Sequence, residues 1–267
     1  MHNAMKKMIS LLVIVCGALV ARAELHTQPV EYKQGDTTLE GWLAYDTSFT
    51  GKRPGVLVVH QWKGLGDYEK KRAEMLARLG YVAFCADIYG KGIRPQTTAD
   101  AGAQAGKYKG DRQLLRARAN AGLDALKKLE QVDGKHVAAI GYCFGGTTVI
   151  ELARSGAELS GVVSFHGGLD SPTPADGKNI RCKVLACHGA DDPFVPAKDL
   201  AAFEDEMRAA KVDWQLMKFG GAVHSFTDWN MDGKALPGAQ YNEAADKRSW
   251  AALGQFFGEI FHRPQPK

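Results

Sequence analysis

The chain has 267 residues, of which 45% are hydrophobic and 24% are charged. These values are ordinary for a globular protein and exclude a disordered or fibrous chain. The length suits one α/β domain with a large core.

The first 23 residues have the composition of a secretory signal peptide. Lys6 and Lys7 precede an apolar run over residues 9–20, and Ala21-Arg22-Ala23 gives a small-x-small cleavage pattern. The run is shorter than a bilayer-spanning helix needs, although a retained N-terminal anchor stays open as an alternative. Met5 is an alternative start of the chain.

Cleavage after residue 23 would leave residues 24–267 as one domain, exported to the periplasm or the extracellular space. It would remove three basic residues and no acidic residue, so the formal net charge would fall from +4 to +1. A charge this close to neutral argues against nucleic acid as a partner and against stable membrane association after signal removal. The expected partner is a small molecule, and the expected assembly is a monomer or a small homo-oligomer.

Strand-like and helix-like segments alternate through the rest of the chain. Residues 30–45 alternate around Gln34-Gly35-Asp36 and predict an N-terminal hairpin. Residues 89–110 are rich in glycine and basic residues, which predicts a loop or small cap, and 170–179 is predicted as a surface loop. Further strands are expected at 55–60, 81–88, 136–142, 161–165, 182–188 and 213–219, and helices at 68–79, 111–130, 197–211 and 244–262.

This alternation predicts an α/β fold with a mostly parallel sheet and helices on both faces. Active residues in such sheets gather beyond the carboxyl ends of the strands. Gln61, Cys143, Asp192 and His224 all fall just after strand-like runs. The sequence therefore places these four residues near one edge of the sheet.

A strand-like run ends in Gly141-Tyr142-Cys143-Phe144-Gly145-Gly146, and a helix-compatible segment follows. This strand–turn–helix context is typical of a nucleophile elbow, with cysteine where serine is commoner. The glycines allow a sharp turn that side chains would obstruct. The alternative for Cys143 is a buried cysteine that acts as a small hydrophobic residue.

Two later loops carry the partners that a nucleophile needs. Asp191-Asp192 follows a strand-like run that ends near His188, and His224 follows the run over 214–219. The chain order nucleophile, acid, histidine is the order found in α/β-hydrolases. Together the three positions favour a catalytic triad over three unrelated residues.

The sequence resembles the dienelactone hydrolase family over about residues 28–262. The resemblance rests on 60–65 (His-Gln-Trp-Lys-Gly-Leu), 141–146, 188–195 (His-Gly-Ala-Asp-Asp-Pro-Phe-Val) and 224–226 (His-Ser-Phe). It implies an α/β-hydrolase fold, a Cys143–Asp192–His224 triad and a thioester acyl-enzyme formed from a small ester or lactone, without a cofactor or metal. It also implies an oxyanion hole made by the backbone N–H groups of Phe144 and Trp62, and the family pattern selects Asp192 over Asp191.

Three positions depart from the family pattern. Gln61 stands where dienelactone-cleaving members resemble each other in having a glutamate, and Lys91 and Asp228 stand where they have substrate-gripping arginines. Lysine lacks the bidentate fork of arginine, and an aspartate repels a carboxylate, so the pattern argues against dienelactone itself as the substrate. The residues expected to bind substrate are Gln61, Tyr89, Lys91, Ser225 and Phe226.

Four cysteines remain after residue 23, and their spacing suggests no metal site. Cys182 and Cys187 are expected on opposite faces of one strand and should not pair. Two other functions stay open on this sequence. One is a thioesterase or acyltransferase with the same acyl-enzyme, and the other is a non-catalytic binding or thiol-redox protein on the same fold.

Overall fold

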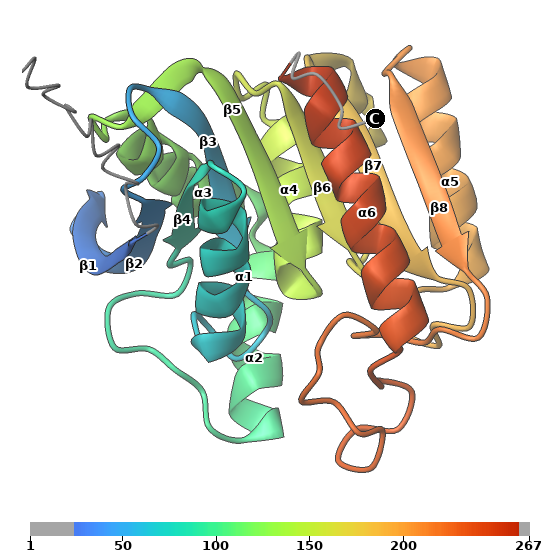
Figure 1. Cartoon of the computed structure of the whole chain (residues 1–267). Helices are drawn as coiled ribbons and strands as arrows, with labels where there is room; N and C mark the ends of the chain where they lie inside the picture. Colours follow the sequence, from blue (N-terminus) through green and yellow to red (C-terminus); the bar gives the residue numbers. More distant parts are fainter. Residues whose placement is uncertain (1–23, 262–267) are drawn as a thin grey trace, which may run out of the picture.

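An eight-stranded sheet runs through the protein in the computed structural model, which describes residues 24–261 (Figure 1). The strand order is β1-β2-β4-β3-β5-β6-β7-β8. The predicted signal peptide lies outside the described residues. The strands are β1 Leu25–Gln34, β2 Thr37–Asp46, β3 Arg53–Val59, β4 Val82–Ala86, β5 Val132–Tyr142, β6 Gly161–Phe165, β7 Lys183–Gly189 and β8 Trp214–Phe219.

The sheet is antiparallel only at its N-terminal edge. Strands β1 and β2 form the predicted hairpin, and β2 pairs antiparallel with β4. Every other pair, from β4–β3 through to β7–β8, is parallel. The predicted fold class is therefore confirmed, and the carboxyl ends of β3, β5, β6, β7 and β8 meet at one edge.

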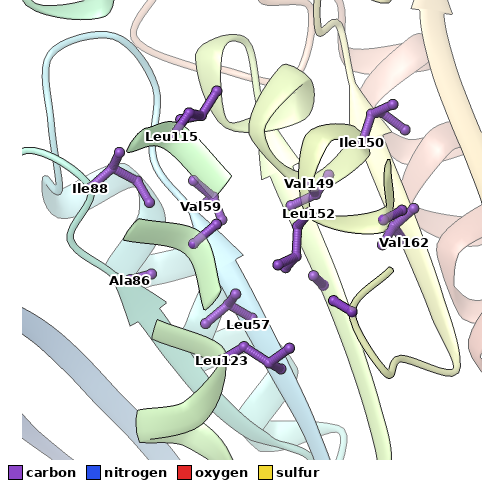
Figure 2. Packing of buried hydrophobic residues seen from close by; sticks show 14 of the residues in the cluster. Leu57, Val59, Ala86, Ile88, Leu115, Leu123, Val149, Ile150, Leu152 and Val162 are labelled. Atoms are coloured by element: carbon purple, nitrogen blue, oxygen red, sulfur yellow. The ribbon is translucent and has the colours of Figure 1, made fainter. Parts of the chain in front are cut away.

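Helices cover both faces of the sheet. The side chains of β3 alternate, so that Leu57 and Val59 enter one apolar cluster and Val56 and Val58 enter the other. The first cluster includes residues of α2 to α5, and Figure 2 shows members of it from β3, α3 and α4; the second cluster includes residues of α1 and α6. The helices are α1 Asp67–Arg78, α2 Thr98–Gly110, α3 Arg112–Lys127, α4 Phe144–Arg154, α5 Ala197–Ala209 and α6 Glu243–Ile260.

The segment 89–110, predicted as a loop or small cap near the site, forms helix α2 in its second half, and Ala105 and Lys109 of this helix line a cavity with Cys143. The hydroxyl of Thr97 accepts a hydrogen bond from the backbone N–H of Asp100 and caps this helix. Ala101, Ala105 and Tyr108 are buried with helical spacing, so packing against the core outweighs the low helix propensity of the glycines. The predicted loop over 170–179 likewise contains a short 3₁₀ helix, Pro174–Asn179.

The four cysteines of the described residues are free, as expected for Cys182 and Cys187. These two side chains pack into different apolar clusters on opposite sides of the sheet. Within residues 24–261, no helix combines the length and the apolar character that membrane spanning requires.

The first turn of helix α4 lies in close contact with strands β3 and β5, where the carboxyl ends of these strands meet. A Cβ atom on Gly145 would lie 2.2 Å from the carbonyl oxygen of Val59 in β3. A Cβ atom on Gly141 in β5 would lie 2.0 Å from the carbonyl oxygen of Gly145. At the other end of α4, the buried Arg154 pairs with Glu151 at 2.8 Å and with Glu206 of α5 at 2.6 Å. Both ends of the helix are thus fixed.

We expect Gly145→Ala to destabilise the fold by about 3 kcal/mol, because the added methyl group meets backbone atoms that cannot move independently. Gly106→Ala in α2 is the matched control, since a Cβ atom on Gly106 would have no other atom within 4 Å. The control should gain about 0.5–1 kcal/mol from helix propensity. Urea unfolding measures both, and equal midpoints for the two variants would contradict the close approach.

Candidate active site

Cys143 occupies the turn between β5 and α4 with a strained backbone. Its φ is 53° and its ψ is −113°, a region that non-glycine residues rarely adopt. The N–H of Cys143 donates to the carbonyl oxygen of Phe165 at 3.0 Å and to Nδ1 of His166 at 3.1 Å. These two acceptors on the neighbouring strand end hold the turn, which raises the thiol above the sheet edge as the elbow pattern predicts.

Three side chains from separate loops form a chain of contacts. His224, after β8, places Nε2 3.0 Å from Sγ of Cys143. Its Nδ1 lies 2.8 Å from Oδ2 of Asp192, after β7. The other oxygen of Asp192 accepts the backbone N–H of Phe194 at 2.8 Å, which fixes the carboxylate. The contacts follow the order nucleophile, base and orienting acid.

Asp191 has a different role from its neighbour. Its carboxylate accepts the backbone N–H of Gly221 at 2.9 Å and ties together the loops that follow β7 and β8. The choice of Asp192 over Asp191 as the partner of His224 therefore agrees with the geometry.

The pKa values of Cys143 and His224 shift in opposite directions. Burial alone would raise the pKa of Cys143, but the charge of His224 and hydrogen bonds from His224 and the Phe144 N–H bring it below its ordinary value. Burial alone would lower the pKa of His224, but the Cys143 thiolate and the hydrogen bond with Asp192 raise it to about 10. Between these two pKa values the pair is a thiolate and an imidazolium.

His166, which is not among the residues predicted from the sequence, supports the turn from the end of the neighbouring strand β6. Its side chain is fully buried, and Nε2 lies 2.7 Å from the hydroxyl of Thr227. Burial keeps the pKa of His166 well below its ordinary value, so the ring is neutral. Its Nδ1 accepts the N–H of Cys143, which leaves Nε2 as the donor to Thr227. The position just after β6, beside the elbow strand, is the sequence signal that locates it.

The expected oxyanion-hole residues, Phe144 and Trp62, line one cavity together with Cys143. Phe144 begins α4, where the helix dipole favours a negative charge. Trp62 follows β3, and its carbonyl oxygen accepts the hydroxyl of Tyr89 at 2.9 Å. This bond anchors the loop after β3, which carries Trp62 into the lining of the cavity beside Cys143.

The N–H groups of Gln61 bond to two carboxylates rather than to the thiol of Cys143. Its backbone N–H donates to Glu69 at 3.0 Å, and its Nε2 donates to Oδ2 of Asp228 at 2.7 Å. The two departures from the family pattern at positions 61 and 228 are therefore one interaction. The acceptor that Gln61 engages is a carboxylate, and the base in contact with Cys143 is His224.

Two cavities meet at Cys143 and His224. The larger, of about 610 Å³, extends over the loop after β3, the start of α1 and the segment after His224. The smaller, of about 190 Å³, lies against α2 and α4, and Lys109 borders it. A substrate bound across the thiol would thus have unequal space on its two sides.

The predicted substrate-binding residues separate into two groups. Gln61 and Ser225 line the larger cavity. Tyr89 and Phe226 are buried and line neither cavity, because their rings pack against Phe144 and His166 respectively. Lys91 is placed incorrectly by the family match: its ammonium pairs with Glu31 and Glu40 on the β1–β2 hairpin, away from both cavities. Tyr89 instead supports Trp62, and Lys109 is the lysine near the thiol.

Among residues 24–261, no group of three or more histidine, cysteine, aspartate or glutamate side chains is arranged to hold a metal ion. The contacts around Cys143 supply a thiol beside an imidazole, together with the backbone N–H of Phe144. That set is suited to acyl transfer.

Comparisons with known proteins agree with the family resemblance seen in the sequence. The model of the "Dienelactone hydrolase family" matches residues 39–261. A solved structure described as a dienelactone hydrolase-like promiscuous phosphotriesterase from metagenomic libraries is 44% identical, with a TM-score of 0.86 over 90% of this chain and 99% of that chain.

Two further similarities are more distant. A curated protein of Bradyrhizobium sp, named "Probable 2-oxo-3-(5-oxofuran-2-ylidene)propanoate lactonase", is 27% identical over 75% of this chain and 82% of its own length. An acylaminoacyl peptidase from Pyrococcus horikoshii shares the fold, with 14% identity and a TM-score of 0.71 over 92% of this chain and 43% of that chain.

We expect Cys143 to react with iodoacetamide at a pH below the ordinary thiol range, because His224 stabilises its thiolate. His224→Ala should raise the pH at which alkylation sets in and slow the reaction at pH 7 by at least about tenfold. Mass spectrometry of the alkylated peptides measures the rate at each pH. Cys143→Ser is the blank, since burial raises the pKa of Cys85, Cys182 and Cys187. An unchanged pH profile in His224→Ala would contradict the ion pair.

Proposed function

The chain belongs to the dienelactone hydrolase family, and we propose that it hydrolyses esters or lactones through a thioester formed on Cys143. The observation that carries this proposal is the unbroken contact from Sγ of Cys143 through His224 to Asp192. It supports acyl transfer because the lowered pKa of Cys143 favours the thiolate, and the raised pKa of His224 favours the imidazolium that can protonate the leaving alcohol.

In the first half of the reaction, the Cys143 thiolate attacks the carbonyl carbon of the ester. A C–S bond forms and the carbonyl π electrons move to oxygen. The N–H groups of Phe144 and Trp62 donate hydrogen bonds to this oxygen and stabilise its negative charge. The intermediate then collapses and the C–O bond breaks. The Nε2 proton of His224 passes to the departing alcohol oxygen, which leaves a thioester and a neutral imidazole.

In the second half, a water molecule replaces the alcohol. Neutral His224 takes a proton from this water through Nε2 while the water oxygen attacks the thioester carbonyl carbon. Collapse of the second intermediate breaks the C–S bond, releases the acid and restores the thiolate–imidazolium pair. Asp192 stabilises the imidazolium of the free enzyme and, through Nδ1, keeps Nε2 of His224 directed at the sulfur throughout.

A phosphotriesterase activity is a second candidate, favoured by the 44% identity to the solved phosphotriesterase. The same thiolate would attack phosphorus, so that an S–P bond forms as the P–O bond to the aryloxide breaks, while the same backbone N–H groups donate to the phosphoryl oxygen. Water activated by His224 would then cleave the S–P bond, release the dialkyl phosphate and restore the thiolate. Diethyl p-nitrophenyl phosphate would then be turned over by the wild-type protein and left intact by Cys143→Ala.

We expect purified protein spanning residues 24–267 to turn over p-nitrophenyl esters and small lactones under reducing conditions. Cys143→Ala and His224→Ala should each lower kcat by about a thousandfold or more, because the two residues act as one catalytic unit and the loss of either disables it. Asp192→Asn should cost less than either, since it alters the orientation and charge of the base rather than removing it. Steady-state kinetics with a fixed ester panel measures all three.

The pattern of rates separates this proposal from the alternatives. A burst of one equivalent without turnover would indicate an acyltransferase that needs another acceptor. Equal turnover in wild type and Cys143→Ala would overturn the thioester mechanism, and a Cys143 that titrates as a thiol without any ester cleavage would favour a binding or thiol-redox protein.

A further inference from the structure

We propose that Asp228 makes the larger cavity selective for esters that carry a positive charge, such as an ammonium group, on the part bound there. This inference rests on the proposed ester hydrolysis and adds the substrate class to it. Three observations carry it: the bonds that Asp228 makes, the absence of a cationic partner for it among the described residues, and the character of the surrounding walls.

Asp228 is a buried residue, 6% exposed, that lines the cavity shared with Cys143 and His224. Its Oδ2 accepts Nε2 of Gln61 at 2.7 Å, and its Oδ1 accepts the backbone N–H of Asn230 at 2.9 Å and Nδ2 of Asn230 at 3.0 Å. These three bonds fix the carboxylate and come from neutral donors. A carboxylate offers about four acceptor positions, so one position on Oδ2 remains for a ligand.

Among the described residues, no lysine, arginine or histidine lies within ion-pair distance of Asp228. Arg72, the buried cation on the neighbouring helix α1, pairs with Asp246 at 2.6 Å and donates to the carbonyl oxygen of Thr227. A buried carboxylate without a charged partner is costly. A cationic ligand group would remove that cost on binding.

A second carboxyl group lies in the wall of the same cavity. Glu69 is also buried in its lining, and its carboxyl group accepts the backbone N–H groups of Gln61 and Gly66. Burial raises the pKa of Glu69, and the charge of Asp228 raises it further, which indicates that the two carboxyl groups are close. At the rim, the exposed Asp67 and Lys63 carry opposite charges in solvent, where they are screened.

Aromatic side chains complete the walls. Trp62, Tyr68 and Phe194 line the same cavity, and aromatic faces attract ammonium groups while excluding water. Apolar walls around a fixed carboxylate suit a cation with a hydrocarbon body better than a small hydrated ion. An ester with a negative charge on that part would meet the buried carboxyl groups of Asp228 and Glu69, whereas the lysine of the lining, Lys63, is exposed to solvent.

The test compares two esters that differ only in charge. Acetylcholine and 3,3-dimethylbutyl acetate have the same shape, with nitrogen replaced by carbon, and pH-stat titration measures the acid released from each. We expect kcat/KM for acetylcholine to exceed that for the neutral ester by about tenfold in the wild-type protein. Asp228→Asn should bring the ratio to within about twofold of one, because the amide keeps the shape and loses the charge.

Asp205→Asn in α5 is the matched control, since it removes the same formal charge from a side chain that is 80% exposed and lines neither cavity. Its ratio should stay at the wild-type value. Urea midpoints establish that each variant is folded. The wild-type ratio is itself decisive even if Asp228→Asn fails to fold: a ratio of one or less overturns the proposal, as does a wild-type ratio retained in Asp228→Asn.

Failure of the proposed function has a separate signature. If neither ester is cleaved, the hydrolysis proposal fails for such substrates, and calorimetric binding to Cys143→Ala decides the charge preference alone. Choline should then bind about tenfold more tightly than 3,3-dimethylbutan-1-ol. Equal dissociation constants for the two alcohols would overturn the inference.

Discussion

The site depends on how closely helix α4 approaches strands β3 and β5. Gly141 and Gly145 allow backbone atoms to approach where any side chain would collide with a carbonyl group. This approach forces Cys143 into its strained conformation, and the strained turn then presents both the thiol and the Phe144 N–H at the sheet edge. Because Phe165 and His166 accept the N–H of Cys143, the neighbouring strand end stabilises a conformation that the chain would not adopt alone.

Parallel strands explain why so much of this site is predictable from the sequence. A short apolar run predicts a buried strand, and the residue after it falls at the sheet's carboxyl edge regardless of the helices between. Cys143, Asp192 and His224 each follow such a run, so their convergence is predictable without coordinates. The nucleophile–acid–histidine order adds the chemistry, and the contacts from sulfur to carboxylate agree with it.

Other parts of the site escape prediction for physical reasons. Helix α2 is stabilised by burial of Ala101, Ala105 and Tyr108, which local propensity does not reveal. Lys91 matches a family position, but the hairpin strands supply Glu31 and Glu40 and remove it from the site. The only sequence signal for His166 is its position directly after β6, because its hydrogen-bond partner Thr227 lies 61 positions away.

The distribution of thiols has a consequence for damage to the protein by peroxides. Cys143 is the thiol with a lowered pKa, so it is the described cysteine that would first become a sulfenic acid. Cys85, Cys182 and Cys187 are buried with raised pKa values, and none of them is suited to act as a resolving thiol. A sulfenic acid on Cys143 would therefore have to be reduced by a small external thiol that enters through the substrate cavity. Further oxidation of the sulfenic acid would compete with this reduction.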